Sequence, residues 1–171
     1  MKNFFKKILA KKKQIGIVLL LALIIIQFIR FDRNTGSAAT TNDISHFTSV
    51  SPEVKTILET SCYDCHSDHT NYPWYDNIQP VGWWLTSHVN DGKEELNFSQ
   101  FNSYRIKRKI RKFHSIASEV KEDEMPLNTY LWIHGNAELN ATQKETIMNW
   151  ANRNYDSLAK IYPDSVPKEE D

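Results

Sequence analysis

The sequence predicts an all-α domain of about four helices, preceded by one N-terminal transmembrane helix. Four segments place apolar residues at the i, i+3, i+4, i+7 spacing of a helix, and no segment alternates polar and apolar residues as a strand would. A lysine-rich start is followed by an apolar run, which is the pattern of a membrane-spanning segment.

The N-terminal elements come first along the chain. Six lysines stand in residues 1–14, and residues 15–31 are largely apolar. Lysines before the run predict a cytoplasmic tail at 1–14, a single-pass anchor in the inner membrane at 15–31 and a periplasmic remainder. A cleaved signal peptide is the alternative. Arg30, Asp32 and Arg33 disfavour it, because a cleavage site needs small neutral residues, but both interpretations export the domain.

The zero formal net charge conceals an uneven distribution. Residues 1–33 hold eight of the 21 Lys and Arg and one of the 21 Asp and Glu, so residues 34–171 carry 13 bases and 20 acids. This acidic part has no evident reason to bind nucleic acid. The chain after the predicted anchor divides into a Thr-, Ser- and Asn-rich linker at 32–50, a single domain at 51–160 and an acidic C-terminal tail at 161–171.

Two helices are predicted in the first half of the domain. The first follows Ser51-Pro52, a cap and a first-turn proline, and its buried face carries Val54, Ile57, Leu58, Ser61 and Cys62. The second runs from Pro80 to Asn90, with Gly92 just past its end. Its inward face is predicted to hold Val81, Trp84, Leu85 and His88.

Two further helices are predicted in the second half. One starts near Ser99, and its apolar stripe comprises Ile106, Ile110, Phe113, Ala117 and Val120. The last opens with Thr142-x-x-Glu145, which resembles a capping box. Its buried face is predicted to hold Ile147, Trp150, Ala151 and Leu158.

The motif with the clearest chemistry is Cys62-Tyr63-Asp64-Cys65-His66, which contains both cysteines of the chain. C-x-x-C-H is the attachment signature of c-type haem. Each thiol can add to one vinyl group of the porphyrin, and the imidazole of His66 can bind the iron. We therefore expect one covalent haem c. The alternatives are a zinc site, which needs four ligands, a thioredoxin-like redox pair, which needs a βαβ context, and a disulfide closing a very short loop.

A second axial ligand has several candidates. Met125 stands in Glu124-Met125-Pro126-Leu127, a polar context that is unusual for a core methionine, and a thioether pairs with histidine at electron-transfer haems. His88 is the main alternative, since it faces inward on the second predicted helix. The remaining candidates are less favoured: His46, His69, His114, His134 and Met148.

Two other features have both a structural and a functional interpretation. Five large aromatic residues lie within residues 72–84, and they either fill the core or form a wall against the porphyrin, with Trp74 and Trp84 as the candidates. Six bases lie in residues 105–112. They form a solvated helix face, neutralise haem propionates, or dock an acidic redox partner or anionic lipid.

Several motifs together give a family resemblance, which spans Val54 to Asn149. The chain resembles a small bacterial haem-binding domain, cytochrome c-like and found in membrane-anchored exported proteins of Bacteroidetes-type bacteria. The resemblance rests on residues 62–67, 71–75, 80–85, 88–89, 96–99 and 124–127. It implies a cytochrome c-like haem domain with Cys62 and Cys65 attached, His66 as one iron ligand and Met125 as the second.

The function expected from these residues is single-electron transfer between redox partner proteins by a periplasmic, membrane-anchored monohaem cytochrome, with no enzymatic activity. The alternatives are a haem-based sensor or gas-binding module, and a peroxidase-like enzyme, which would need an open iron and a distal acid–base group.

Overall fold

The computed structural model describes residues 2–166, with side chains from residue 11 onward, and every regular element in that range is helical. The all-α prediction is therefore confirmed, and one isolated antiparallel bridge joins Thr35 and His69. The α-helices are α1 (Lys2–Ile26), α2 (Pro52–Ser61), α3 (Tyr63–His66), α4 (Val81–Glu95), α5 (Ile106–Lys121), α6 (Asn128–Leu131) and α7 (Ala141–Ile161). The 3-10 helices are η1 (Ile44–His46), η2 (Trp74–Asn77), η3 (Phe98–Ser103), η4 (Gly135–Ala137) and η5 (Pro163–Ser165).

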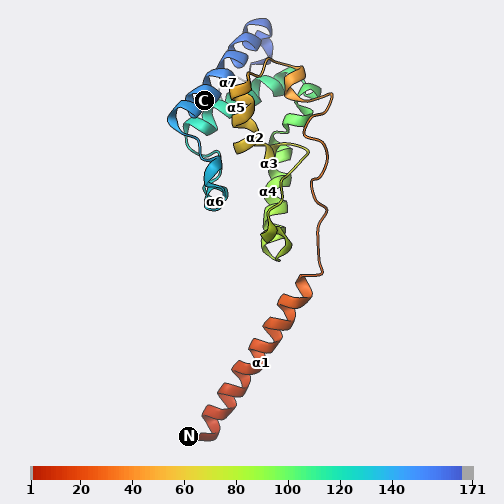
Figure 1. Cartoon of the computed structure of the whole chain (residues 1–171), viewed down its shortest axis with the longest axis vertical. Helices are drawn as coiled ribbons and strands as arrows, with labels where there is room; N and C mark the ends of the chain where they lie inside the picture. Colours follow the sequence, from red (N-terminus) through yellow and green to blue (C-terminus); the bar gives the residue numbers. More distant parts are fainter. Residues whose placement is uncertain (1, 167–171) are drawn as a thin grey trace. The chain divides into compact units, whose positions relative to one another are not determined.

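The chain forms two compact units, each with its own contacts. One unit comprises residues 2–33 and 72–88, and the other comprises residues 34–71 and 89–166. Helix α4 contributes residues to both (Figure 1).

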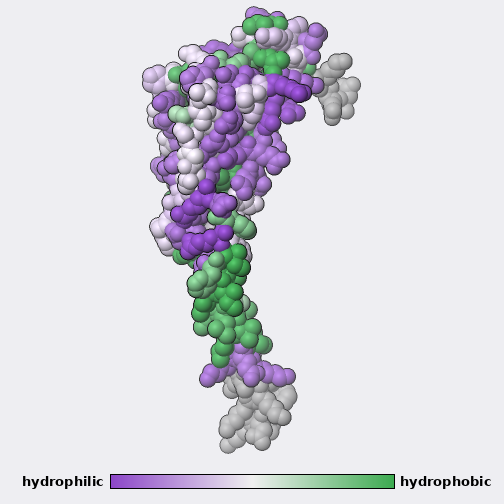
Figure 2. Space-filling model, turned by 90° about the vertical axis from the view of Figure 1, so that its right-hand side faces the viewer, coloured by the Kyte–Doolittle hydropathy of each residue, from purple (hydrophilic) through white to green (hydrophobic). Residues whose placement is uncertain are grey.

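The predicted transmembrane helix at 15–31 is wrong. In the part of the chain that the structure describes, no helix combines the length and the apolar character needed to cross a membrane. The physical reason is that α1 ends at Ile26. Its apolar stretch from Ile15 therefore rises only about 18 Å, against about 30 Å of hydrocarbon in a bilayer. Figure 2 shows this stretch as a hydrophobic band beside the exposed lysines 11–13, and the side chains of residues 1–10 in the predicted basic tail lie outside the described residues.

Polar contacts hold the segment after α1 against the loop before α4. Gln27 Nε2 donates to Gln79 O at 3.0 Å, and Gln79 N donates to Gln27 Oε1 at 2.9 Å. Arg33 forms an ion pair of 2.5 Å with the buried carboxylate of Asp76. The indole of Trp83 donates to the carbonyl of Ile29 at 2.8 Å. The aromatic loop at 72–77 is thus fixed by amides and charges as well as by its rings.

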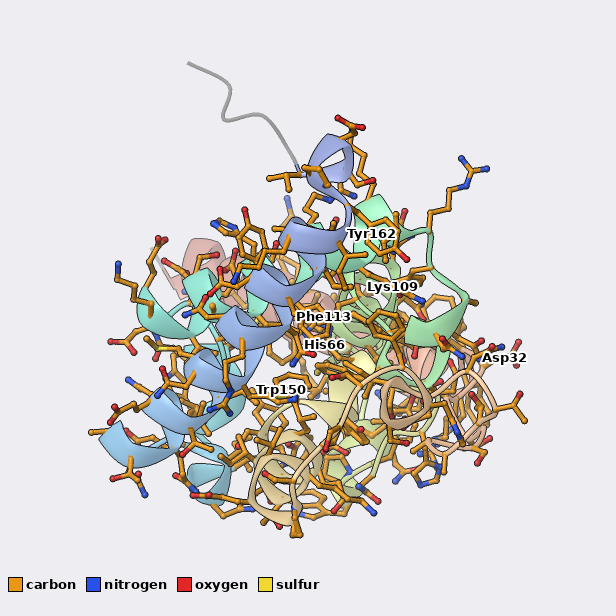
Figure 3. The ribbon with its side chains drawn as sticks, turned by 90° about the horizontal axis from the view of Figure 1, so that it is seen from above. Asp32, His66, Lys109, Phe113, Trp150 and Tyr162 are labelled. Atoms are coloured by element: carbon orange, nitrogen blue, oxygen red, sulfur yellow. The ribbon has the colours of Figure 1, made fainter. Side chains whose placement is uncertain are left out.

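The hydrophobic core of the other unit lies between α5 and α7, which run side by side (Figure 1). The Phe113 ring lies 5.0 Å from that of Phe101 and 5.5 Å from that of Trp150, centroid to centroid, below α7 in Figure 3. Four members of the predicted stripe on α5 are buried: Ile110, Phe113, Ala117 and Val120. The apolar periodicity of this segment therefore reports the core correctly.

Helix starts follow capping chemistry. Ser51 Oγ accepts from Val54 N at 3.3 Å, and Pro52 is the first residue of α2, as predicted. The predicted capping box at Thr142 and Glu145 is wrong. Asn140 caps α7 instead: its Oδ1 accepts from Gln143 N at 2.9 Å, and Gln143 Oε1 accepts from Asn140 N at 3.0 Å. An asparagine two positions earlier reaches the first free amides, which leaves Thr142 inside the helix.

The segment predicted as a linker at 32–50 packs against the core of its unit. Ile44 is completely buried in it, and Asp43 caps η1 by accepting from Ser45 N. Its short polar side chains hydrogen-bond instead of remaining solvated. Part of the predicted acidic tail, residues 167–171, lies outside the described residues, and residues 163–165 form η5.

Candidate functional site

A cavity of about 290 Å³ opens within the unit formed by residues 34–71 and 89–166. Most of its wall is apolar and comes from α2, η3, α5, the loop after α5, and α7 with the segment just before it. It brings together three residues singled out from the sequence, Cys62, His66 and Met125. The other lining residues are Leu58, Ser61, Glu95, Leu96, Phe98, Lys112, Ser115, Ile116, Glu119, Val120, Pro126, Leu139 and Ile147.

The cysteine motif lies where α2 gives way to α3. Cys62 is the C-cap of α2, with its N–H on Leu58 O at 3.0 Å. The Cys62 carbonyl then accepts from Cys65 N at 3.2 Å and from His66 N at 3.0 Å, so the motif folds as one further helical turn. The buried face of α2 thereby positions Cys62 on the cavity wall, whereas Cys65 is not among the lining residues.

Both thiols of the motif are free. Burial, followed by the nearby Cys65, raises the pKa of the Cys62 thiol to about 12. Burial, followed by the charge of Asp64, raises the pKa of the Cys65 thiol to about 11. Both groups are therefore protonated at neutral pH. Among residues 11–166, no three His, Cys, Asp or Glu side chains gather where they could hold a metal ion.

The imidazole of His66 is held by two backbone carbonyls. Nδ1 lies 2.8 Å from Gly92 O and 2.9 Å from Leu96 O, and its ring lies toward the middle of the view in Figure 3. Carbonyl oxygens only accept, so these partners assign the proton to Nδ1 and leave the lone pair on Nε2. Burial is the main cause that lowers the pKa of His66, and Lys112 lowers it further. A neutral imidazole with a fixed tautomer is the form that binds metals.

Gly92 brings α4 against the cysteine motif. A Cβ at this position would lie 2.7 Å from Cys65 O and 3.2 Å from Cys65 Cβ. The prediction that Gly92 follows the end of its helix is wrong, because α4 continues to Glu95. The absence of a side chain here permits close approach of two backbones, which brings the Gly92 carbonyl within reach of His66.

Met125 is half-buried on the loop after α5, and it lines the cavity. Its N–H donates to Glu119 O at 3.2 Å, and the N–H of Glu124 donates to the same carbonyl at 3.0 Å. The loop turns at Asp123, whose φ of 61° is in the left-handed region, and the Asp123 carboxylate pairs with Lys144 on α7.

Two lysines of the basic stretch are buried rather than solvated. Lys112 lines the cavity with a side chain only 9% exposed, and its Nζ lies 2.8 Å from Glu95 Oε2, whose side chain is 77% exposed. Lys109 places its Nζ 3.9 Å from the centroid of the Phe47 ring and does not line the cavity. Lys112 is therefore a cation beside the cavity, and its partner is an exposed surface carboxylate that a bound anion can replace.

The remaining residues proposed from the sequence are not among the lining residues, and Trp74, Trp84 and His88 belong to the other unit. Trp74 is 76% exposed, Trp84 is 46% exposed, and neither is a lining residue. The prediction that Trp84 faces inward is therefore wrong. His88 Nδ1 lies 2.9 Å from Trp84 O, and its ring packs 4.3 Å from that of Trp84. The less favoured histidines contact other groups: His69 contacts Gly36 O, His114 packs on Tyr155 and His134 stacks on Tyr130.

Sequence reasoning missed the residues that position His66 and the cysteine motif. Gly92 and Leu96 act through main-chain carbonyls, which no side-chain pattern signals. Asp64 offered a signal, since an acid between the two cysteines needs partners when half-buried. Its Oδ1 accepts from Asn71 N and Nδ2, both at 3.0 Å, and its Oδ2 accepts from the Tyr130 hydroxyl at 2.8 Å.

Comparison with known proteins gives one finding. A family model described as a haem-binding domain matches residues 21–153, which is more than half of the chain. No curated protein and no solved structure matches the chain.

Proposed function

The chain belongs to the haem-binding domain family and binds haem, and from that premise we propose that it attaches one haem c through Cys62 and Cys65 and carries single electrons between redox partner proteins. The proposal concerns the mode of attachment and the use of the haem. Bound haem supplies an iron that can cycle between Fe(II) and Fe(III).

The observation that carries the proposal is the state of His66. An axial imidazole must present a lone pair, and the two carbonyls on Nδ1 leave that lone pair on Nε2. His66 lies directly after Cys65 and shares the cavity wall with Cys62. A haem joined to the thiols would therefore lie beside an imidazole that is already oriented and neutral.

The other cavity residues fit a haem as well. Leu58, Ile116 and Ile147 give an apolar wall for the porphyrin, and Met125 offers a thioether, the partner of histidine at many electron-transfer haems. Lys112 can exchange Glu95 for a propionate carboxylate. In this function His66 and Met125 would hold the iron in both oxidation states, and the apolar wall would keep water away.

We place the haem domain in the periplasm. The support is the attachment chemistry of the C-x-x-C-H motif together with the basic, then apolar, N-terminal sequence, which suits export. Fractionation of cells that express the chain tests this, since haem-containing protein confined to the cytoplasm contradicts it.

The test of attachment is chemical. The full chain is produced with haem-maturation machinery, and haem that stays with the protein after acid–acetone extraction is measured. We expect retention in the wild type and its loss in Cys62→Ser/Cys65→Ser. Haem that is extractable from the wild type contradicts covalent attachment.

The test of the electron-carrier role is spectroscopic. We expect a six-coordinate, low-spin haem with the weak far-red band of sulfur ligation. The band should vanish in Met125→Leu and persist in Met148→Leu, because Met148 packs on the core and does not line the cavity. A high-spin wild type that takes up carbon monoxide readily contradicts the carrier and supports a sensor or an enzyme. A low-spin wild type without the sulfur band, which becomes high-spin in His88→Ala but not in Met125→Leu, identifies His88 as the ligand.

A further inference from the structure

A hydrogen bond joins the cysteine motif to the loop that carries Met125. The hydroxyl of Tyr130, on α6, donates to Asp64 Oδ2 at 2.8 Å, and Asp64 stands between the two cysteines. The two residues are 66 positions apart in the chain. The cysteine motif therefore contacts the Met125 loop and α6 through this side-chain bond, although these segments are far from it in the sequence.

The acceptor side of this bond is fixed in place. Asp64 Oδ1 accepts from both Asn71 N and Asn71 Nδ2 at 3.0 Å, and the Asp64 carbonyl accepts from Thr70 Oγ1 at 2.6 Å. These contacts leave Oδ2 as the oxygen that faces Tyr130. A carboxylate constrained in this way is a strong acceptor for a phenolic O–H.

The donor side is joined closely to Met125. Helix α6 starts at Asn128, and Tyr130 N donates to Leu127 O at 2.9 Å, so Tyr130 follows Met125-Pro126-Leu127 in one folded turn. At its other end Met125 donates to Glu119 O on α5. Met125 thus lies between two attachments: a backbone bond to α5 and the Tyr130 side-chain bond to the cysteine motif.

We propose that the Asp64–Tyr130 hydrogen bond is a latch that positions Met125 for the iron. This rests on the proposed function, in which Met125 is the second axial ligand. The residues next to the His66 ligand thereby also hold the loop of the other ligand. Tyr130 is a positioning residue, because it acts through the loop and not by touching the haem.

Imidazole competition in the ferric holoprotein measures the latch. Imidazole binds only when the sixth position opens, so its affinity reports how firmly Met125 is held. In Tyr130→Phe the hydroxyl is lost and the ring remains, and we expect imidazole to bind about five to ten times more tightly. Tyr155→Phe is the matched control and should match the wild type, because Tyr155 packs on His114 and does not line the cavity.

The substitution Tyr130→Phe in a Met125→Leu background distinguishes an effect on the position of Met125 from an effect on the entry of imidazole into the cavity. In Met125→Leu there is no thioether to release, so adding Tyr130→Phe should leave imidazole affinity unchanged. An equal rise in that background overturns the latch, because the change would then act on entry to the cavity. Asp64→Asn changes the acceptor instead of the donor, and it is the variant to use if Tyr130→Phe loses its haem. The single amide oxygen stays with the two donors of Asn71, so the NH2 group faces Tyr130 and can donate to its hydroxyl oxygen. We expect a smaller rise in imidazole affinity, because this neutral bond is weaker but not lost.

The failures of the two proposals are distinguishable. A wild type without the far-red sulfur band overturns the proposed ligation, and the latch with it. A wild type with that band, whose imidazole affinity is the same in Tyr130→Phe, overturns the latch alone and leaves the electron carrier intact.

Discussion

The two candidate iron ligands are held in different ways. His66 lies on a helical turn, and backbone carbonyls of Gly92 and Leu96 fix its ring. Met125 lies on a loop that depends on two backbone bonds to the carbonyl of Glu119 and on side-chain contacts further along. Backbone contacts between packed helices cannot be lost one at a time, whereas a loop can lift when one side chain changes. The difference predicts a fixed histidine and a releasable methionine.

The largest effect should come from Gly92→Ala, which attacks the His66 side. On an ordinary helix this change is stabilising by propensity. Here the new methyl group would meet Cys65 O at 2.7 Å, so α4 and α3 must separate. We expect a loss of stability of about 3 kcal/mol and little covalent haem, measured by thermal unfolding and by haem content per protein.

Gly135→Ala is the control for that variant, since a Cβ at Gly135 meets nothing within 4 Å. It should keep full haem content. If Gly92→Ala also keeps full haem content, the backbones of α4 and of the cysteine motif are not packed tightly enough to fix His66.

The next effect concerns pH, because the imidazole of His66 can gain a proton and the thioether of Met125 cannot. The folded-state pKa of His66 is lowered, so the unfolded chain binds the proton more readily. In the haem-free Cys62→Ser/Cys65→Ser protein, the contribution of His66 to the free energy of unfolding is fully present above the ordinary histidine pKa of about 6.5. It is lost progressively as the pH decreases from that value. The slope contributed is up to about 1.4 kcal/mol per pH unit. Urea unfolding between pH 7.5 and 5 measures it.

His66→Gln in the same background is the comparison for this slope. The glutamine has no proton to gain in this range, so its stability should vary less with pH. Parallel profiles for the two proteins would show that the acid sensitivity arises at other groups.

A smaller effect should follow from Lys112→Met in the holoprotein. Removal of a buried cation beside the haem favours the ferric state, so the reduction potential should fall by on the order of 50 mV. Lys109→Met removes an equally buried cation that does not line the cavity, and its potential should change less. Redox titration of both variants measures this, and equal shifts would contradict the placement of Lys112 at the haem.

The smallest effect should come from Lys144→Met, which breaks the ion pair to Asp123 at the exposed base of the Met125 loop. An exposed ion pair of this kind contributes about 0.4 kcal/mol or less. We therefore expect imidazole affinity to rise about twofold at most, well below the effect of Tyr130→Phe. A larger rise would show that the Asp123–Lys144 ion pair, and not the hydrogen bond of Tyr130, is the main contact that holds the loop.

The elements that the sequence predicted well are those set by local chemistry. Ser51-Pro52 starts α2 as expected, and the stripe on α5 is buried, because capping and 3.6-residue periodicity act within one helix. Long-range packing decided the rest. Gly92 looked like a helix terminator and is a point of close approach, while Trp84 shared a face with Leu85 and yet remains exposed. The apolar run at 15–31 looked long enough to span a membrane, but its helix ends at Ile26.

The paired carbonyls on His66 have a consequence for how the haem is acquired. An unrestrained histidine must give up its rotational freedom when it binds iron, and that loss weakens binding. Here the loss has already occurred during folding of the polypeptide. A haem bound through His66 would therefore meet an imidazole whose orientation folding has already set.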